Sequence, residues 1–178
     1  MVKKNFLAII QARYDSYRLP GKICKKIVKN LSVIEIIISR LKKSKKIDQI
    51  VVSTSNNIND KKIIEICKKF KIRYFIGSEN DVLDRFYKTA LKFRAKNILR
   101  ITGDCPMVDP VMVDKFIEKF VLLKPDYLSN TIKPTYPDGL DLEIFSFNTL
   151  KKTWKNCKDE HDREHVTQYM IKNKKFNK

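Results

Sequence analysis

The chain has 178 residues, a length typical of one globular domain, and 43% of them are hydrophobic, which is enough to build a core. Together with a charged fraction of 33%, this composition excludes a disordered chain. No apolar run approaches the roughly 20 residues that span a bilayer, and the N-terminal apolar stretch is too short for a secretory signal. We therefore expect one domain over residues 1–178, located in the cytoplasm.

The formal net charge of +18 raises the question of nucleic-acid binding. Lysine far outnumbers arginine, and the lysines are spread over nearly every expected helix instead of forming one arm or stripe. The sequence has no zinc-finger spacing and no aromatic-interleaved RNA signature, so no specific nucleic-acid partner is expected. We interpret the charge as a solvated surface that also attracts anionic molecules such as nucleoside triphosphates. The four cysteines are scattered without a C-x-x-C pair, which favours reduced thiols.

Strand and helix patterns alternate from the N-terminus. Phe6 to Ile10 is a continuous apolar run, typical of a strand buried on both faces of a parallel sheet. A polar segment with a Pro20-Gly21 turn signal follows, and Ser32 is placed to cap a helix with apolar residues at helical spacing through Leu41. Further strands are predicted at 50–53, 72–76 and 98–101, and helices beginning at Asn59 or Asp60, at Asn80-Asp81 and, with a Pro in the first position, at Asp109.

The remaining expected elements are strands at 127–129 and 142–145 and helices at 149–154 and 161–171. Repeated alternation of strand and helix predicts a Rossmann-like α/β fold, with a mostly parallel sheet and helices on both of its faces. In such folds ligands bind beyond the carboxyl ends of the strands. We therefore expect the functional residues to lie on the loops at those ends.

The loop after the first strand, from Gln11 to Lys22, is rich in phosphate-binding side chains. Arginine forks match phosphate oxygens, lysine supplies a point charge, and a backbone bent at Gly21 can offer N–H donors. The loop is neither a Walker A motif nor G-x-G-x-x-G. Residue types alone leave a phosphate cradle and an ordinary solvated basic loop as alternatives.

A second loop, from Ile101 to Pro106, places Asp104 directly after a buried strand. Gly103 precedes this carboxylate and Pro106 follows it, so its position is restrained. One fixed aspartate suits Mg²⁺, which keeps waters and substrate oxygens as its other ligands. The alternative is an aspartate that only caps a turn or a helix.

Segments along nearly the whole chain, from Phe6 to about Tyr169, resemble the cytidylyltransferase family, and they occur in the family's order. They are Q-A-R-x-x-S-x-R-L-P-G-K at Gln11 to Lys22, G-S-E-x-D-V-L-D-R at Gly77 to Arg85, R-I-T-G-D-C-P at Arg100 to Pro106, S-N-T at Ser129 to Thr131, Y-P-D-G-L-D-x-E at Tyr136 to Glu143 and R-E-H-V-T at Arg163 to Thr167. The most similar branch includes spore coat polysaccharide biosynthesis protein F. The enzymes that activate acylneuraminate and 3-deoxy-manno-octulosonate are more distant. The resemblance implies the nucleotide-diphospho-sugar transferase type of fold.

The resemblance also implies roles for individual residues. Arg13 and Lys22 match triphosphate-binding and catalytic positions, and Asp104 matches the metal-binding aspartate. The other implied nucleotide-binding positions are Gln11, Ala12, Ser16, Arg18, Ser78 and Asp81. Residues expected to contact the acceptor, or to add a second metal contact, are Asn130, Asp138, Asp141, Glu143, Arg163 and His165. For His165, an ordinary helix-face histidine is the alternative.

The reaction implied by the resemblance is transfer of CMP from CTP to an acidic or phosphorylated sugar. The acceptor oxygen attacks the α-phosphorus and pyrophosphate leaves, with Mg²⁺ as cofactor, in the synthesis of surface polysaccharide precursors. The resemblance further suggests a homodimer. A sugar-nucleotide-dependent glycosyltransferase is one alternative, with Asp141-Leu142-Glu143 as the nearest equivalent of a D-x-D motif. A non-catalytic nucleotide-binding module is another.

The sequence departs from the family in two places. Tyr14-Asp15 and Tyr17 stand where the family usually has Met-Gly and Thr, so Asp15 adds a negative charge near the expected phosphates. Relatives also usually continue into a V-D-x-x-x-D-like segment, and we expect this chain to lack it. An impaired member of the family is therefore a further alternative.

Overall fold

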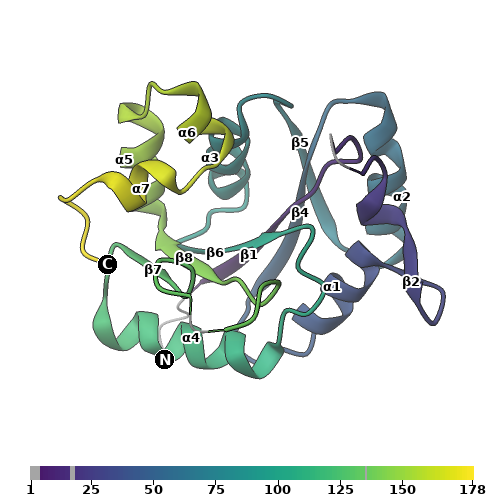
Figure 1. Cartoon of the computed structure of the whole chain (residues 1–178), viewed down its shortest axis with the longest axis horizontal. Helices are drawn as coiled ribbons and strands as arrows, with labels where there is room; N and C mark the ends of the chain where they lie inside the picture. The colour runs from purple at the N-terminus through teal and green to yellow at the C-terminus, as the bar shows by residue number, and fades with distance from the viewer. Residues whose placement is uncertain (1–4, 17–18, 135) are drawn as a thin grey trace.

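The computed structural model describes residues 5–16, 19–134 and 136–178, and a six-stranded sheet forms its centre (Figure 1). The strand order is β5-β4-β1-β6-β8-β7. The strands are β1 (Phe6–Gln11), β4 (Gln49–Ser55), β5 (Arg73–Gly77), β6 (Asn97–Thr102), β7 (Tyr127–Ser129) and β8 (Glu143–Ser146). Strands β5, β4, β1 and β6 pair in parallel, whereas β8 pairs antiparallel with both β6 and β7.

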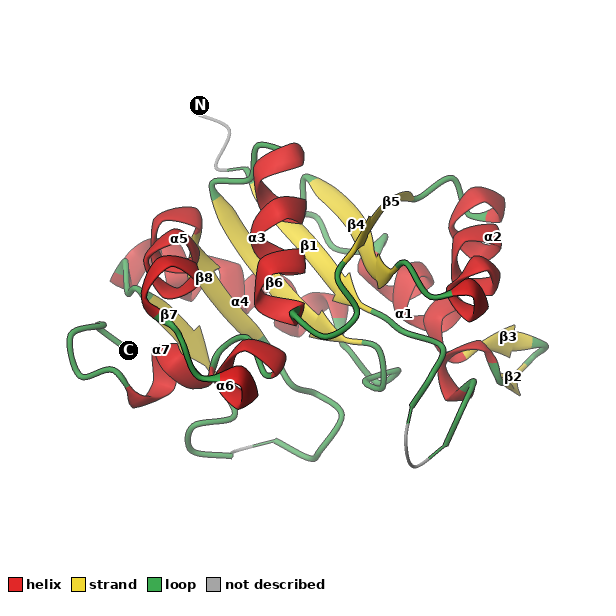
Figure 2. Ribbon diagram, turned by 90° about the horizontal axis from the view of Figure 1, so that it is seen from above, coloured by secondary structure: helices red, strands yellow, loops and turns green. Residues whose placement is uncertain are grey.

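Helices cover both faces of the sheet, as Figures 1 and 2 show. They are α1 (Val33–Leu41), α2 (Lys61–Lys69), α3 (Val82–Lys92), α4 (Pro110–Leu123), α5 (Phe147–Asn156), α6 (Glu160–Glu164) and α7 (Gln168–Lys172). The predicted mostly parallel α/β fold is confirmed. Among the helices of the described residues, none has the length and apolar character needed to cross a bilayer.

The continuous apolar run of β1 is explained by burial on both sides. Phe6, Ala8 and Ile10 pack into one core with α1, α2 and α4, while Leu7 and Ile9 pack into a second core with α3, α5 and α7. Side chains alternate across a strand, so each face of β1 meets its own layer of helices. All five side chains are almost fully buried. The carboxyl end of β1 is thereby fixed in the middle of the molecule.

The expected start of α4 is confirmed in detail. Asp109 accepts a hydrogen bond from the Met112 backbone N–H at 2.8 Å, and Pro110 takes the first helical position. At α1, Ser32 and Glu35 form a capping box, in which the Glu35 carboxylate accepts the Ser32 backbone N–H at 2.7 Å. Both helix starts are local features that residue type alone encodes.

The single helix predicted over 161–171 is wrong. The structure instead has two short helices, α6 and α7, because the backbone at Val166 turns into the left-handed region with φ of 61°. Val166 is also completely buried in the core beneath α3 and α5. Tertiary packing therefore overrides the helical pattern at this point.

The structure adds a small hairpin that the sequence pattern did not predict. It follows the short helix η1 (Lys22–Cys24) and joins β2 (Lys26–Val28) to β3 (Leu31–Ser32). Lys29 and Asn30, at its turn, have φ of 47° and 61°. Positive φ at both central positions is usual for tight hairpins, but glycine is the residue that normally signals it.

We predict that Asp109→Ala lowers the free energy of unfolding by about 1 kcal/mol, because it removes the N-cap of α4. The measurement is urea denaturation followed by circular dichroism, with Lys119→Ala on the exposed side of α4 as the control. A midpoint equal to that of the control would show that the cap contributes nothing.

Candidate functional site

A cavity of about 290 Å³ opens at the carboxyl ends of β1 and β6. Its lining includes several of the residues singled out from the sequence. The lining residues are Gln11, Arg13, Ser16, Lys22, Ile23, Arg100, Thr102, Gly103, Asp104 and His165. The two loops selected from the sequence therefore meet in one place, at the edge of the sheet where ligands of such folds bind.

The contact that joins these loops is an ion pair between Lys22 and Asp104. The Lys22 Nζ donates to the Asp104 Oδ2 at 2.9 Å, and the Asp104 side chain is half-exposed to the cavity. Lys22 is held at the start of η1, whose next residue, Ile23, is buried. A cation and a carboxylate are thus fixed next to each other at the mouth of the cavity.

Two glycines shape these loops, and one of them allows the loops to approach each other. A Cβ at Gly103 would lie 2.5 Å from the Ile23 Cδ1 and 2.7 Å from the Gln11 carbonyl oxygen, so no larger residue fits without displacing backbone. Gly21 has φ of 71°, and its N–H donates to the Tyr14 carbonyl at 2.8 Å. Glycine tolerates that left-handed conformation at no steric cost.

The Asp104 carboxylate is held in its charged form. Partial burial acts to raise its pKa, but hydrogen bonds from Lys22 and Thr102 outweigh this effect, and the net pKa lies below the usual value. Because the folded-state pKa is lowered, the stabilisation from this contact is present at neutral pH and is lost as the pH falls through that pKa. The Asp104 carboxylate is therefore ionised at neutral pH and can bind a cation.

A buried polar network lies beneath the cavity. Arg100 on β6 forms an ion pair with Glu143 on β8 and donates through Nη2 to the Gln11 Oε1 at 3.0 Å. The Tyr127 hydroxyl donates to the Glu143 Oε1 at 2.5 Å. Burial acts to raise the pKa of Glu143, but the positive charge of Arg100 and the hydrogen bonds to the carboxylate lower it overall. Burial and the neighbouring carboxylate raise the pKa of Tyr127.

This network places Glu143, a predicted acceptor-binding residue, inside the protein with its side chain 8% exposed. It also includes Arg100, which the sequence reasoning did not select. A charged residue within an otherwise apolar central strand is the signal that could have identified it. Gln11 and Arg100 together form a polar floor for the cavity.

The segment between β7 and β8 carries more of the predicted acceptor-binding residues. Asn130 holds this segment, because its amide donates to the Leu140 carbonyl and accepts the Leu142 N–H, both at 2.8 Å. Asp138 is exposed, and Asp141 is partly buried. Burial and then the negative charges of Asp138, Glu143 and Asp104 raise the pKa of Asp141. Asp141 thus lies within electrostatic reach of Asp104.

Arg163 and Asp81, predicted for different subsites, contact each other. The guanidinium Nη2 and Nε donate to the Asp81 Oδ2 at 2.8 and 3.0 Å. The other Asp81 oxygen accepts the Asp84 N–H and caps α3, and the Ser78 hydroxyl accepts the Asp81 N–H. These side chains link the start of α3 to α6, so part of their hydrogen-bonding capacity is already used.

Arg13 lies between the first cavity and a second one of about 790 Å³. The second cavity is lined by Arg13, Asn80, Asp81, Lys158, Glu160, His161, Arg163 and Glu164. The Arg13 guanidinium is partly exposed and lies 3.7 Å from a Glu164 oxygen. The His165 ring, which lines the first cavity, is 4.4 Å from the ring of His161. Both cavities therefore share one half-exposed cation.

Three further positions of the first loop differ in their surroundings. Ala12 is buried, and its N–H donates to the Ser53 carbonyl at 3.0 Å. Asp15 has the Asn59 amide nitrogen 3.2 Å from one carboxylate oxygen. Arg18, predicted to bind nucleotide, lies outside the described residues.

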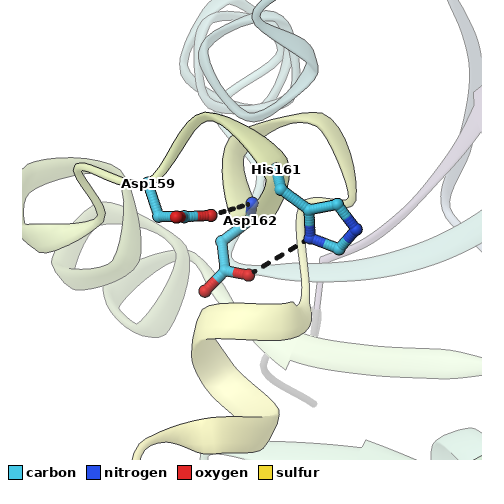
Figure 3. A group of neighbouring side chains, drawn as sticks. All are labelled: Asp159, His161 and Asp162. Carbon is cyan, nitrogen blue, oxygen red and sulfur yellow. Dashed lines mark hydrogen bonds and ion pairs between the residues drawn. The ribbon is translucent and has the colours of Figure 1, made fainter.

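Asp159, His161 and Asp162 form a compact group at the start of α6 (Figure 3). Asp159 accepts the Asp162 N–H at 2.8 Å and so caps the helix. Asp162 binds the Lys172 Nζ at 2.6 Å, and the His161 Nδ1 lies 3.6 Å from the same oxygen. Since both carboxylates already have protein partners, we interpret the group as the cap of α6 and its link to α7.

A family model described as cytidylyltransferase matches residues 7–177. The chain belongs to the cytidylyltransferase family. This membership confirms the resemblance drawn from the motifs, and residues of three of those motifs line the cavity at the carboxyl ends of β1 and β6.

Individual proteins are similar to this chain over most of its length. The chain is 42% identical to the Methanocaldococcus jannaschii protein MJ1063, over 94% of this chain and 67% of that protein. It is 34% identical to the Bacillus subtilis spore coat polysaccharide biosynthesis protein SpsF, over 93% of this chain and 70% of that protein. A cytidylyltransferase structure from Leptospira borgpetersenii superimposes with a TM-score of 0.92 at 34% identity, covering 97% of this chain and 73% of the other.

We predict that Lys22→Met raises the pKa of Asp104. The substitution removes the hydrogen bond and the positive charge that lower this pKa, while the partial burial that raises it remains. The measurement is a carboxyl ¹³C NMR titration, with the exposed Lys25→Met as the control. An Asp104 pKa that is the same in both variants would show that Lys22 does not lower it.

Proposed function

We propose that this cytidylyltransferase transfers CMP from CTP to an acidic or phosphorylated sugar and releases pyrophosphate. The observation that carries the proposal is the Lys22–Asp104 pair, which brings the loops after β1 and β6 together at one cavity. Membership of the family supports nucleotidyl transfer. The similarity to the spore coat polysaccharide biosynthesis protein SpsF supports a role in polysaccharide biosynthesis.

The positive groups of the first loop suit a triphosphate. Arg13 offers a planar fork of donors, Lys22 offers a compact charge, and the Ser16 hydroxyl lines the same cavity. Neutralising phosphate charge and aligning the α-phosphorus are the main contributions a protein can make to this reaction. We assign these three residues to the triphosphate. Gln11 and Arg100 form the floor on which it rests.

Asp104 fits the role of metal ligand. It is ionised, half-exposed and placed at the cavity, and one carboxylate suffices for Mg²⁺ when phosphates and waters complete the coordination. Bound there, Mg²⁺ would neutralise phosphate oxygens and restrain their orientation. Lys22 already contacts the Asp104 Oδ2, so the same side chain would lie beside both the metal and the phosphates.

In the proposed reaction an oxygen of the acceptor sugar forms a bond to the α-phosphorus, and the bond from that phosphorus to the oxygen bridging the β-phosphate breaks. The leaving group is pyrophosphate, and no nucleophile from the protein is required. We assign Asp138 and Asp141 to the acceptor, because Asp141 interacts electrostatically with both Asp138 and Asp104 and carboxylate oxygens accept hydrogen bonds from sugar hydroxyls. His165 lines the same cavity and offers a donor to an acidic group.

The glycosyltransferase alternative is less well supported by the geometry. Its nearest D-x-D equivalent is Asp141-Leu142-Glu143, but the Glu143 carboxylate is buried against Arg100 and Tyr127. The two carboxylates therefore do not face a common cation at the surface. The homodimer, the cytoplasmic location and the single domain over residues 1–178 stay predictions.

The proposal is tested by calorimetric titration of the 178-residue chain with CTP, UTP, ATP and GTP, with and without Mg²⁺. We expect binding that depends on Mg²⁺ and favours CTP. Absence of binding to every nucleotide would contradict the proposal and favour a chain that has lost the chemistry of its family.

We predict that Asp104→Asn abolishes Mg²⁺-dependent pyrophosphate release while the far-ultraviolet spectrum and unfolding midpoint stay close to those of the parent chain. The amide keeps the size of the side chain but loses the charge that holds the cation. Asp114→Asn, at a carboxylate on α4 away from the cavity, is the matched control. Full turnover by the Asp104 variant would remove this residue from the metal site.

We further predict that Lys22→Ala weakens CTP binding by on the order of tenfold or more, because a charge-assisted contact to phosphate is lost. Calorimetry with CTP–Mg²⁺ measures the effect, and Lys25→Ala controls for the loss of one surface charge. Equal CTP affinity in the two variants would rule out Lys22 as a phosphate ligand.

A further inference from the structure

Arg85, in the first turns of α3, is the largest fully buried side chain in the described part of the protein. Its Nη1 donates to the backbone carbonyls of Ser78 and Glu79. Its Nε and Nη2 have no hydrogen-bond partner among the described residues. An incompletely paired, buried guanidinium costs free energy, and the reaction proposed above makes no use of it.

Asp60 is a second buried charge close to the nucleotide loop. It is 1% exposed and lies at the start of α2. Its Oδ1 accepts the backbone N–H of Tyr14 at 2.6 Å, and its Oδ2 accepts the N–H of Ser55 at 2.8 Å. The Thr54 and Ser55 hydroxyls also donate to Oδ2. Asp60 therefore ties the backbone next to Arg13 to the carboxyl end of β4.

The two charges act on each other through a water-poor interior. Burial lowers the pKa of Arg85 to about 10, and the negative charge of Asp60 is the strongest influence in the opposite direction. Arg85 is thus charged at neutral pH. The segments that hold the two residues also touch, because the Asn56 N–H donates to the Gly77 carbonyl at 3.2 Å.

Gly77 shows how closely Arg85 packs under the end of β5. A Cβ at this position would lie 2.9 Å from the Arg85 Cγ and 2.9 Å from a ring carbon of Phe75. The guanidinium can reach the carbonyls of Ser78 and Glu79 only because this space is empty. The path of the 78–81 loop therefore depends on Arg85.

We propose that Asp60 and Arg85 are positioning residues that couple the loop carrying Arg13 to the loop carrying Asp81. Asp60 fixes the first loop through the Tyr14 N–H, and Arg85 fixes the second through two carbonyls. The hydrogen bond between Asn56 and Gly77 joins the segments that carry these two opposite charges. Both loops border the cavities that share Arg13. For its effect on CTP, this inference rests on the proposed function.

The test is a double-mutant cycle on the full chain, with Asp60→Asn, Arg85→Met and the combined variant titrated with CTP–Mg²⁺. Each single substitution is expected to lower CTP affinity on the order of tenfold. The loss of affinity in the combined variant is expected to be clearly smaller than the product of the two single losses, since the groups act as a pair. Arg85→Lys, which keeps the charge but loses the fork, is expected to recover part of the affinity.

Two control variants separate positioning from general destabilisation. Ile117→Val removes one buried methyl group from α4 and lowers stability without touching either loop. Arg94→Met removes an exposed cation just after α3. The inference is overturned if folded Arg85→Met binds CTP as tightly as these controls. It is also overturned if the combined variant loses CTP affinity by the full product of the two single losses. Should Arg85→Met not fold, Gly77→Ala displaces the same side chain and is judged by the same criterion.

A second measurement does not depend on CTP. Amide hydrogen exchange at Tyr14 reports the bond to Asp60, and it is expected to accelerate in Arg85→Met or Arg85→Lys but not in Ile117→Val. Unchanged exchange at Tyr14 overturns the coupling. If the parent chain fails to bind CTP, the proposed function fails, and the exchange experiment alone decides whether the two loops are coupled.

Discussion

The contact between Lys22 and Asp104 is the constraint on which the site depends. It joins loops that are separated by 82 positions in the sequence, and it requires both to lie at the carboxyl edge of the sheet. Parallel pairing of β1 with β6 places them there, while Gly103 allows them to approach within van der Waals distance. The pair also keeps the Asp104 carboxylate charged. One interaction thereby links the fold, the electrostatics and the proposed chemistry.

Charges that pair with one another inside the protein surround this contact. Arg100, Glu143 and Tyr127 form a buried network below the cavity, and Asp81 with Arg163 joins α3 to α6 beside it. Removing one partner of a buried charge pair leaves the other uncompensated, so these networks hold their positions strongly. Arg13, Lys22 and Asp104 remain partly exposed to solvent, where a substrate can reach them.

The sequence predicted the sheet, most helices and the two loops that meet, because continuous apolar runs and caps such as Asp109-Pro110 are local signals. It did not predict the break at Val166, where packing imposes a left-handed backbone on a β-branched residue, nor the hairpin whose turn is Lys29-Asn30 without glycine. The sequence also did not predict the contact between Asp81 and Arg163, since these residues were assigned to separate subsites and only the fold brings them together. The resemblance to the family could indicate the roles of single residues, whereas the contacts between their side chains depend on three-dimensional packing.

Nucleotidyl transfer at the Lys22–Asp104 site is tested most directly by ³¹P NMR of the full chain with CTP, Mg²⁺ and a panel of acidic and phosphorylated sugars. We expect pyrophosphate and a CMP-linked sugar to accumulate in equal amounts with at least one acceptor. Tight CTP binding without pyrophosphate from any acceptor, or release of a nucleoside diphosphate when a sugar nucleotide is supplied instead, would contradict it.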